Sequence, residues 1–307
     1  MSLPCTFGNS IQLSFYRLLI ILLNTKIVVL FPNGKINLGL NIVRKRTDGF
    51  HDIETVFYPV AIHDALEVID ANQQPQDVDL SASGEELDCD VSNNLCVQAY
   101  QLLKKHFPHM PGIKMHLHKT MPVGAGLGGG SADGAFTLKL LNEKFGLGLS
   151  DEKLRALALE LGSDCPFFLI NKPCFATGRG EILHPIQLDL SRYKLLLVNP
   201  RIKINTAEAF SLANPVVPSK SIEKIINEPI DTWKNELRND FEKPVFEKYP
   251  QIKTIKQQLY DLGAVYVSMT GSGSTVFGIF ENNFAIRYSF PANYFVRELV
   301  GKVQQFP

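Results

Sequence analysis

The stretch Pro122-Val-Gly-Ala-Gly-Leu-Gly-Gly-Gly-Ser-Ala-Asp133 decides the fold of this chain. It places five of the 22 glycines within seven positions and leads directly into a helical pattern that begins at Ser131. Glycine suits backbone that must take a positive φ or approach a ligand closely. At the start of a helix, several N–H groups point the same way, with the positive end of the helix dipole behind them. The stretch therefore predicts an anion cradle, and a phosphate chain is the cellular anion of that size.

Two better-known glycine motifs share spacings with this loop but fail in its context. Gly124, Gly126 and Gly129 spell the dinucleotide fingerprint G-x-G-x-x-G, which requires an acid at the end of a second strand about 20 residues later. The acid at that distance, Glu143, lies in a helical pattern instead. A P-loop would have a lysine at Gly130, so charge neutralisation must come from elsewhere in the chain. A bare strand-to-helix turn needs only one or two glycines.

The composition is that of an ordinary soluble enzyme, with 307 residues, 45% hydrophobic and 20% charged, in one large domain or two smaller ones. Lys+Arg and Asp+Glu both number 31, and this balance predicts no nucleic-acid partner. The five cysteines form no C-x-x-C pair and are expected to be reduced thiols of a cytoplasmic protein. His116 and His118 alternate on a predicted strand without a third ligand, so we expect no metal site there.

The N-terminal stretch 11–31 is rich in aliphatic residues, but Arg17, Asn24 and Lys26 interrupt it. No uninterrupted apolar run reaches the length of about 18 residues that a membrane span needs, so we expect no membrane partner. No A-x-A-like cleavage site follows the apolar run after Arg17, which argues against a signal peptide. Residues 1–25 are therefore predicted to be an atypical extension, with the catalytic chain beginning near Lys26.

Periodicity and turn residues predict a mixture of strands and helices. Strands are expected at 26–31, 36–43, 54–62, 66–69, 78–81, 112–118, 195–199, 265–269 and 276–280. Helices are expected at 94–107, 131–145, 150–162, 205–212, 237–246 and 251–262. Residues 163–168 are interpreted as a short loop that runs into an apolar strand. Because strands and helices come in runs without strict alternation, the pattern indicates an α+β fold of two halves, divided near 180–191.

Three segments resemble the GHMP kinase superfamily in order and spacing, namely Gly34-Lys-Ile-Asn-Leu-Gly-Leu40, the glycine loop, and Thr270-Gly-Ser-Gly-Ser274. Arg46-Thr-Asp-Gly-Phe-His51 and Gly162-Ser-Asp-Cys-Pro-Phe-Phe168 are similar to the members that act on a cytidine diphosphate-linked methylerythritol. The resemblance covers residues 26–280 and implies the GHMP kinase two-domain fold. It implies a ribosomal protein S5 domain 2-like, ATP-binding N-terminal domain at 26–185, a smaller α/β ferredoxin-like C-terminal domain at 186–307, and an active site in the cleft between them.

The resemblance also implies the reaction. ATP would give its γ-phosphoryl group to the 2-hydroxyl of 4-diphosphocytidyl-2-C-methyl-D-erythritol, with Mg²⁺ present, forming the 2-phosphate and ADP for non-mevalonate isoprenoid synthesis. Asp164 is implied as the general base. Lys35 is implied as the cation beside it, which could supply the charge of the missing P-loop lysine. The implied partner is this small molecule, and we expect a monomer or a weak homodimer.

The motif matches imply which residues bind the two nucleotides. Asn94 and Lys119 are expected to line the adenine pocket. The loop residues expected to hold the ATP phosphates are Pro122, Val123, Gly124, Ala125, Gly126, Leu127, Gly128, Gly129, Gly130, Ser131 and Ala132. The residues expected to contact the acceptor are Asn37, Phe50, His51, Thr206 and Phe210, with cytosine between the Phe50–His51 pair and Phe210.

The chain departs from the family pattern at two positions. Phe50 stands where tyrosine is usual, so it keeps the stacking face without the hydroxyl, and Gly34 stands where alanine is common. Homoserine and mevalonate kinases are the nearest alternative, although they usually carry GLGSS in place of GLGGG and lack the Asp-Gly-Phe-His stretch. A nucleotide-binding sensor without catalysis is the other alternative, and intact Lys35 and Asp164 argue against it.

Overall fold

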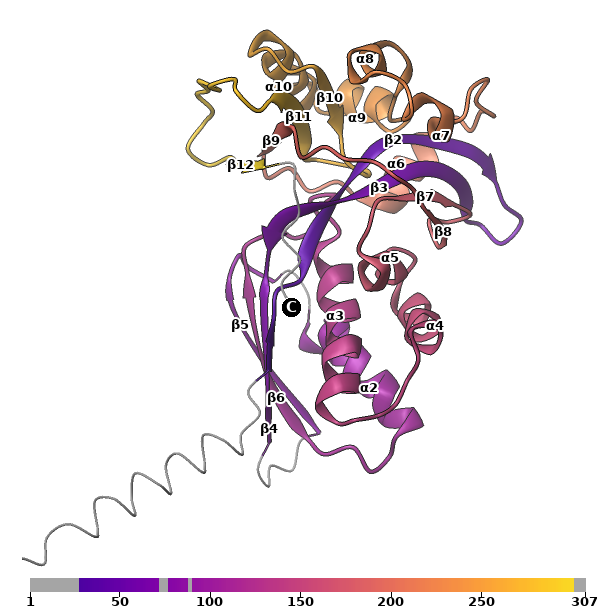
Figure 1. Cartoon of the computed structure of the whole chain (residues 1–307), viewed down its shortest axis with the longest axis vertical. Helices are drawn as coiled ribbons and strands as arrows, with labels where there is room; N and C mark the ends of the chain where they lie inside the picture. The colour runs from indigo at the N-terminus through magenta and orange to yellow at the C-terminus, as the bar shows by residue number, and fades with distance from the viewer. Residues whose placement is uncertain (1–27, 72–76, 88–89, 301–307) are drawn as a thin grey trace, which may run out of the picture.

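The computed structural model describes residues 28–71, 77–87 and 90–300, so the predicted extension at 1–25 lies outside the described residues. The strands form three four-stranded sheets. Figure 1 shows an elongated molecule with packed strands and helices at each end and two long strands running between the ends. None of the helices in the described ranges is both long and apolar enough to cross a membrane.

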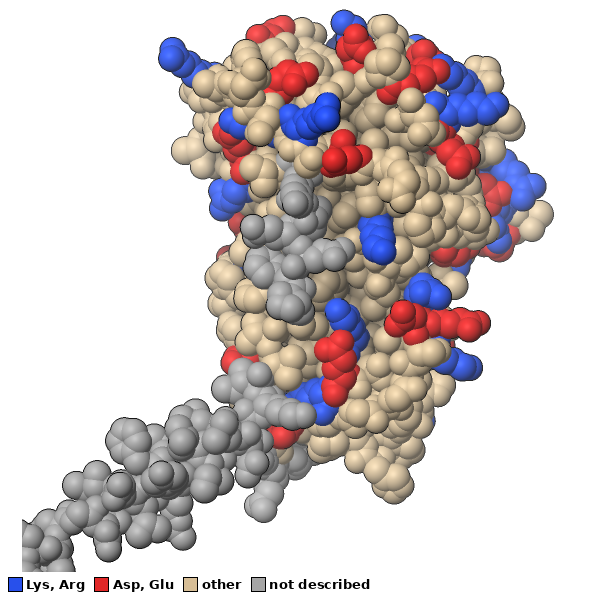
Figure 2. Space-filling model, viewed as in Figure 1, with Lys and Arg blue, Asp and Glu red and all other residues tan. Residues whose placement is uncertain are grey.

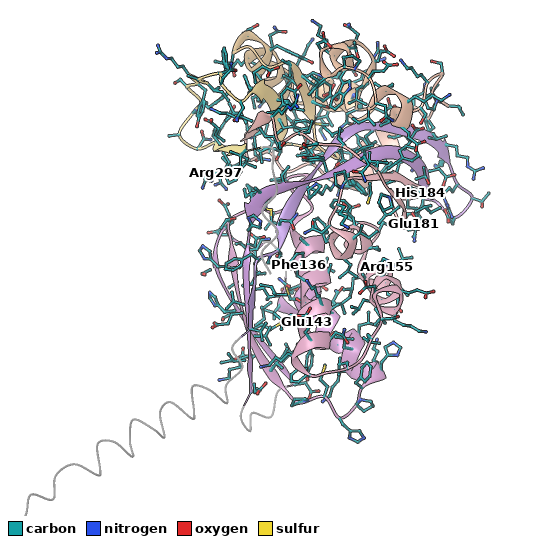
Figure 3. The ribbon with its side chains drawn as sticks, in the orientation of Figure 1. Phe136, Glu143, Arg155, Glu181, His184 and Arg297 are labelled. Atoms are coloured by element: carbon teal, nitrogen blue, oxygen red, sulfur yellow. The ribbon has the colours of Figure 1, made fainter. Side chains whose placement is uncertain are left out.

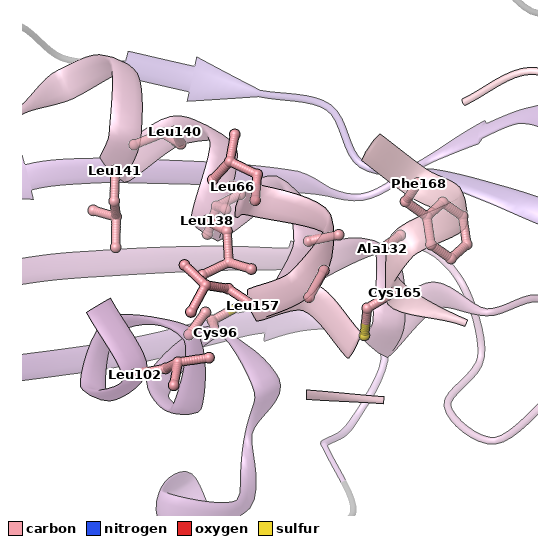
Figure 4. Close-up of a cluster of buried hydrophobic side chains, with 14 of the residues drawn as sticks. Leu66, Cys96, Leu102, Ala132, Leu138, Leu140, Leu141, Leu157, Cys165 and Phe168 are labelled. Atoms are coloured by element: carbon pink, nitrogen blue, oxygen red, sulfur yellow. The ribbon is translucent and has the colours of Figure 1, made fainter. Parts of the chain in front are cut away.

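The first sheet has the strand order β1-β4-β6-β5, in which only β5 and β6 are parallel. Along β6, buried Met115 and Leu117 alternate with His116 and His118, which face outward. The buried face packs against α2 and α3, and Figure 4 shows Leu138 of α3 within this core. The elements of this layer are β1 (Val28–Leu30), β4 (Ala65–Asp70), β5 (Val78–Gly84), η1 (Val91–Asn93), α2 (Leu95–His106), β6 (Ile113–Lys119), α3 (Gly129–Lys144) and α4 (Asp151–Leu161).

The second sheet is built on a long hairpin that joins the two ends of the molecule. Strands β2 (Asn33–Lys45) and β3 (His51–His63) pair antiparallel, and β7 (Cys174–Thr177) and β8 (Ile182–Pro185) extend the sheet in the order β2-β3-β7-β8. Ile36 of β2 belongs to the same buried cluster as C-terminal side chains such as Trp233 and Tyr266. The two halves therefore share a hydrophobic core, which fixes the cleft between them.

The third sheet is antiparallel throughout, in the order β10-β11-β9-β12, and its strands all follow residue 186. Its strands are β9 (Tyr193–Asn199), β10 (Tyr266–Met269), β11 (Val276–Glu281) and β12 (Phe295–Val300). The accompanying helices are α6 (Thr206–Leu212), α7 (Ile222–Ile225), η2 (Ile230–Thr232), α8 (Trp233–Glu236), α9 (Glu242–Lys248) and α10 (Pro250–Asp261). The exact domain limits, 26–185 and 186–307, stay a prediction.

The α+β fold with two halves is confirmed, and most predicted elements match observed ones within a few residues. The interpretation of 163–168 was wrong, because Cys165–Ile170 forms the helix α5, whose Pro166 suits the first turn of a helix. The helix predicted at 237–246 begins only at Glu242. Before it, the Asn239 side chain accepts a hydrogen bond from the Phe241 N–H and donates to the carbonyls of Met269 and Gly271.

Charges of both signs are mixed on the face of the molecule that Figure 2 shows. On the face shown in Figure 2, lysine and arginine side chains lie among aspartate and glutamate side chains, and no large area carries a single sign. This distribution agrees with the equal totals of 31 basic and 31 acidic residues. A protein that binds a polyanion normally presents a coherent basic surface, and this face lacks such a surface.

Candidate active site

A cleft of about 880 Å³ lies between the two halves of the molecule. It is at the upper end of the size range of small-molecule sites, which is about 300–1,000 Å³. The cleft is lined by every predicted site residue except Ala132, whose side chain is fully buried in the core beneath α3. The folded chain therefore brings together residues from position 35 to position 210 around one cavity.

The glycine loop enters α3 with backbone that only glycine adopts easily. Gly124, Gly126 and Gly128 all have positive φ, at 67°, 79° and 72°. A side chain at Gly126 would place its Cβ 2.1 Å from the Thr270 carbonyl oxygen, so this position tolerates no other residue. Gly128 stands directly before the first residue of α3 in the left-handed conformation.

Gly130 is different, because neither packing nor backbone geometry requires a glycine there. It lies in the first turn of α3, its φ is ordinary, and no atom lies within 4 Å of the position that a Cβ would take. Glycine inside a helix costs about 0.5–1 kcal/mol relative to alanine. The space in front of Gly130 lies at a helix N-terminus and opens into the cleft, so it suits an anion.

A second glycine turn, Thr270–Thr275, braces this loop from the C-terminal half. The Thr270 hydroxyl donates to the Gly126 carbonyl at 2.9 Å and accepts from the Asn37 N–H at 3.0 Å. The Thr275 N–H donates to the Ala125 carbonyl at 3.3 Å. The three sequence segments noted above therefore meet in one hydrogen-bonded unit.

Lys35 and Asp164 form an ion pair at the floor of the cleft, with Nζ and Oδ2 3.3 Å apart. The Lys35 side chain is 5% exposed, whereas that of Asp164 is 33% exposed and reaches the cavity. The Lys35 ammonium also donates to Asn37 Oδ1 at 2.6 Å and lies 4.7 Å from the centre of the Phe57 ring. A Cβ at Gly128 would lie 3.0 Å from Lys35 Cγ, so the lysine lies directly against the loop.

This arrangement suits proton abstraction next to the predicted phosphate site. A carboxylate exposed to a cavity can accept a proton from an alcohol that comes within hydrogen-bond distance. The ammonium beside it stabilises the negative charge that develops on the oxygen and on a transferred phosphoryl group. Asp164 is the residue directly before α5, its backbone is already helical, and its side chain makes no capping hydrogen bond.

The predicted base-binding aromatics lie at the other end of the cleft. The rings of His51 and Phe210 stack on each other, with centroids 4.9 Å apart and planes 13° apart. A base between them would need about 7 Å, or two contacts of about 3.5 Å each, so one of these rings must shift to admit it. Phe50 is half exposed, and the Arg179 guanidinium carbon lies 4.7 Å from its ring centre. Thr206 shares a hydrogen bond with Ser272 at 3.0 Å on the cleft wall.

The surroundings of His51 favour the neutral form of its imidazole ring. Partial burial lowers its pKa below the ordinary value, and the charge of nearby Lys45 acts in the same direction. A neutral imidazole keeps one donor and one acceptor nitrogen. His51 therefore offers a polar edge next to the stacking faces.

Beneath the glycine loop lies a buried ionic cluster, which we call the Lys119 cluster, formed by Lys119, Asp64 and Asp133. The Lys119 ammonium contacts carboxylate oxygens of both acids, that of Asp133 at 2.7 Å, and all three residues are almost completely buried. Asp64 Oδ1 also accepts hydrogen bonds from the N–H groups of Thr120 and Met121. One ammonium thus serves two carboxylates, and the surplus negative charge is buried.

Of the two carboxyl groups in the Lys119 cluster, that of Asp133 has fewer hydrogen-bond donors to compensate its charge. Its Oδ1 has no hydrogen-bond partner among the described residues, and burial raises the pKa of this carboxyl to about 7. The two carboxylates raise the pKa of Lys119 against the opposing effect of burial. Asp64 and Asp133 were not predicted as site residues, because Asp64 lies outside every motif and Asp133, the last residue of the glycine loop, has no partner within that loop. Asp133 could have been noticed as a charge within an otherwise small, apolar loop.

Family patterns match both halves of the chain. Residues 94–172 match the GHMP kinases N terminal domain, and residues 221–293 match the GHMP kinases C terminal domain. The first match contains the glycine loop, Asp164 and α5, and the second contains the Thr270–Thr275 turn. The chain belongs to the GHMP kinase family.

Particular relatives agree with this assignment. Over 257 residues the chain is 52% identical to a 4-diphosphocytidyl-2-C-methyl-D-erythritol kinase of Azobacteroides pseudotrichonymphae, covering 83% of this chain and 94% of that protein. It is also 52% identical over 254 residues to the kinase of the same name from Bacteroides fragilis, covering 83% and 92%. A crystal structure of 4-(cytidine 5'-diphospho)-2C-methyl-D-erythritol kinase superposes with a TM-score of 0.71 and 29% identity, covering 82% and 90%.

A homoserine kinase structure from Cytophaga hutchinsonii superposes with a TM-score of 0.60 at 15% identity, covering 89% of this chain and 95% of that one. At that identity the likeness concerns the fold alone. The homoserine kinase alternative is therefore compatible with the fold but gains no support for its substrate.

Proposed function

We propose that this chain is a kinase that transfers the γ-phosphoryl group of ATP to the 2-hydroxyl of 4-diphosphocytidyl-2-C-methyl-D-erythritol, forming the 2-phosphate and ADP. The observation that carries the proposal is the Lys35–Asp164 pair, 3.3 Å apart, in contact with the glycine loop inside one cleft. The relatives of that name, 52% identical over 83% of the chain, support this choice of substrate. A place in non-mevalonate isoprenoid synthesis follows from the same substrate.

In the proposed mechanism, the chain positions two nucleotides and moves one proton. The ATP phosphates lie against the N–H groups of the glycine loop and the open space before Gly130. The acceptor hydroxyl lies beside Asp164, which takes its proton as the oxygen attacks the γ-phosphorus. Lys35, held by Asn37, stabilises the charge on both groups. Phosphoryl transfer depends mostly on positioning and on charge stabilisation, and these residues supply both.

The two bases occupy opposite ends of the cleft in this proposal. Adenine lies near Asn94 and Lys119, at the end formed by the starts of α2 and α3. Cytosine lies with Phe50, His51 and Phe210, and the side chains of Asn37 and Thr206 contact the acceptor. We further propose a cytoplasmic enzyme that acts as a monomer or weak homodimer.

Mg²⁺ fits the site as an ion carried with ATP. Within the described ranges, no three acidic, histidine or cysteine side chains converge as a metal site. The Ser131 hydroxyl lines the cleft at the start of α3 and is the side chain suited to hold the ion beside the phosphates. When bound, Mg²⁺ neutralises phosphate charge.

The test compares acceptors. Purified protein is incubated with ATP, Mg²⁺ and either 4-diphosphocytidyl-2-C-methyl-D-erythritol, bare 2-C-methyl-D-erythritol, homoserine or mevalonate, while ADP release is followed. We expect rapid turnover with the cytidine compound and at least about 100-fold lower kcat/KM with the others. The other acceptors lack the cytidine diphosphate group that the aromatic end of the cleft would bind. Equal rates with the bare polyol would disprove the cytidine assignment, and preference for homoserine or mevalonate would replace it.

A further inference from the structure

One arginine in the cleft has no role in the function proposed above. Arg179 occupies the turn between β7 and β8, flanked by Gly178 and Gly180, whose φ angles are +68° and +105°. The backbone N–H of Arg179 donates a hydrogen bond to the Glu181 carboxylate. Figure 3 shows Glu181 on the side of the molecule where β7 and β8 lie.

This turn touches both parts of the acceptor site. The Gly178 carbonyl accepts a hydrogen bond from the Ile53 N–H at 2.7 Å, two residues beyond His51. A Cβ at Gly180 would lie 3.7 Å from Asp164 Oδ1. Arg179 therefore stands between the residues proposed to bind cytosine and the proposed base.

Neighbouring side chains orient the guanidinium of Arg179 but leave hydrogen-bond donors on it for a ligand. One face lies against the Phe50 ring at 4.7 Å, and Nε is 3.6 Å from Glu181 Oε1. Among the described residues, neither terminal nitrogen of Arg179 donates a hydrogen bond, and the side chain is 30% exposed and lines the cleft. Two other cations of the cleft are already engaged, Lys35 by Asp164 and Asn37, and Lys119 by two buried carboxylates.

We propose that Arg179 binds the diphosphate of the acceptor substrate and thereby selects a diphosphate-linked nucleoside over a neutral polyol. This inference rests on the proposed function, which places cytosine at Phe50 and the acceptor hydroxyl at Asp164. The diphosphate joins these two parts covalently, so it must pass through the space between them, where Arg179 stands. A guanidinium presents parallel N–H groups that match phosphate oxygens, and the Phe50 ring holds it in one orientation.

The experiment measures binding of cytidine and of cytidine diphosphate to the full chain by calorimetry, before and after Arg179→Gln. We expect the substitution to weaken cytidine diphosphate binding roughly 10- to 100-fold, as expected for loss of a charge-assisted pair, and to leave cytidine within about 3-fold. In turnover assays the KM for the acceptor should rise by a similar factor, with kcat and the KM for ATP near the wild-type values. Arg179→Lys, which keeps the charge without the planar fork, should be intermediate.

Arg297→Gln is the matched control. Arg297 also lies over a phenylalanine ring, that of Phe295 at 4.8 Å, but on β12, away from Glu181 in Figure 3 and outside the cleft. It should change neither affinity. An equal loss of cytidine and cytidine diphosphate in Arg179→Gln would overturn the proposal, since Arg179 would then only support Phe50.

A second outcome would also overturn it. Lys45 lines the cleft near His51 and is the competing cation. If Lys45→Gln rather than Arg179→Gln removed the preference for the diphosphate, the diphosphate would lie on Lys45.

Failure of the proposed function would give a different result, because the wild-type protein would then not phosphorylate the cytidine acceptor at all.

Discussion

Replacing Lys119 by methionine should destabilise the protein strongly, and more so at high pH. Methionine has a similar length and fills the space without the charge. The change would leave Asp64 and Asp133, which are 0% and 2% exposed, without their shared cation. Asp64 keeps the N–H groups of Thr120 and Met121, but Asp133 Oδ2 loses its ammonium and Oδ1 has no partner among the described residues.

The magnitude follows from the cost of an uncompensated buried charge. Removing one partner of a buried ion pair costs about 3–5 kcal/mol, which for a chain of this length lowers the melting temperature by roughly 5–8 °C. Asp133 already has a pKa raised to about 7, and loss of the cation raises this pKa further. The carboxyl can then escape the penalty by taking up a proton, so the loss should be smaller at pH 5.5 than at pH 8.

The assay is equilibrium unfolding in urea and thermal melting at both pH values, for Lys119→Met, Asp133→Asn and the double variant. The double variant should recover a large part of the loss, because it removes one of the two stranded charges. Lys114→Met, on the outer face of the same strand, is the control and should stay within about 0.5 kcal/mol of wild type. A loss below about 1 kcal/mol for Lys119→Met at pH 8, or no recovery in the double variant, would refute this account of the cluster.

Further substitutions test the neighbouring features. Because the pKa of Asp133 is raised, its protonation stabilises the fold at low pH, and this stabilisation disappears as pH rises through about 7. The free energy of unfolding of Asp133→Asn, measured in urea titrations, should therefore gain about 2 kcal/mol relative to wild type between pH 5.5 and pH 8. A difference that stays constant with pH would contradict this prediction. Gly126→Ala should cost at least about 3 kcal/mol, because its Cβ meets the Thr270 carbonyl at 2.1 Å, and a soluble variant of wild-type stability would be inconsistent with this loop geometry. Gly130→Ala should be as stable as wild type or about 0.5–1 kcal/mol more stable, yet bind ATP at least about 10-fold more weakly in calorimetry, whereas unchanged ATP affinity would move the phosphates elsewhere.

The α+β fold and the backbone of the glycine loop could be predicted from the sequence because their signals are local. Five glycines before a helical pattern constrain the backbone wherever the segment lies, and the observed φ angles at Gly124, Gly126 and Gly128 follow directly. Asn94 and Ser150 were placed correctly at helix starts, since side-chain capping depends only on residues two or three positions later.

The errors and omissions arose where distant residues decide the outcome. The six residues Cys165–Ile170 are uniformly apolar, so periodicity could not distinguish a buried helix from a strand. The Lys119 cluster joins residues from three separate segments, and only the pairing of β4 with β6 brings Asp64 to Lys119. Arg179 reaches the cleft from a single turn flanked by Gly178 and Gly180, and no local pattern reveals the direction of that turn.

The direct stacking of His51 on Phe210 was likewise unpredicted. The motif indicated that a base should lie between the aromatic groups, and the structure has them in contact at 4.9 Å. Apolar ring faces lose exposed area when they pack together, which favours the direct stacking of His51 on Phe210. Under the proposed function, binding of cytosine at this place exchanges one aromatic contact for another.

The central claim is that Asp164, paired with Lys35 beside the glycine loop, is the base for phosphoryl transfer to the cytidine acceptor. The most direct measurement is a single-turnover assay of wild type and Asp164→Asn with radiolabelled ATP and 4-diphosphocytidyl-2-C-methyl-D-erythritol, with ATP affinity measured in parallel. We predict that Asp164→Asn binds ATP within about 3-fold of wild type and transfers phosphate at least about 100-fold more slowly. Transfer by Asp164→Asn at the wild-type rate would contradict the assignment of this carboxylate and the mechanism built on it.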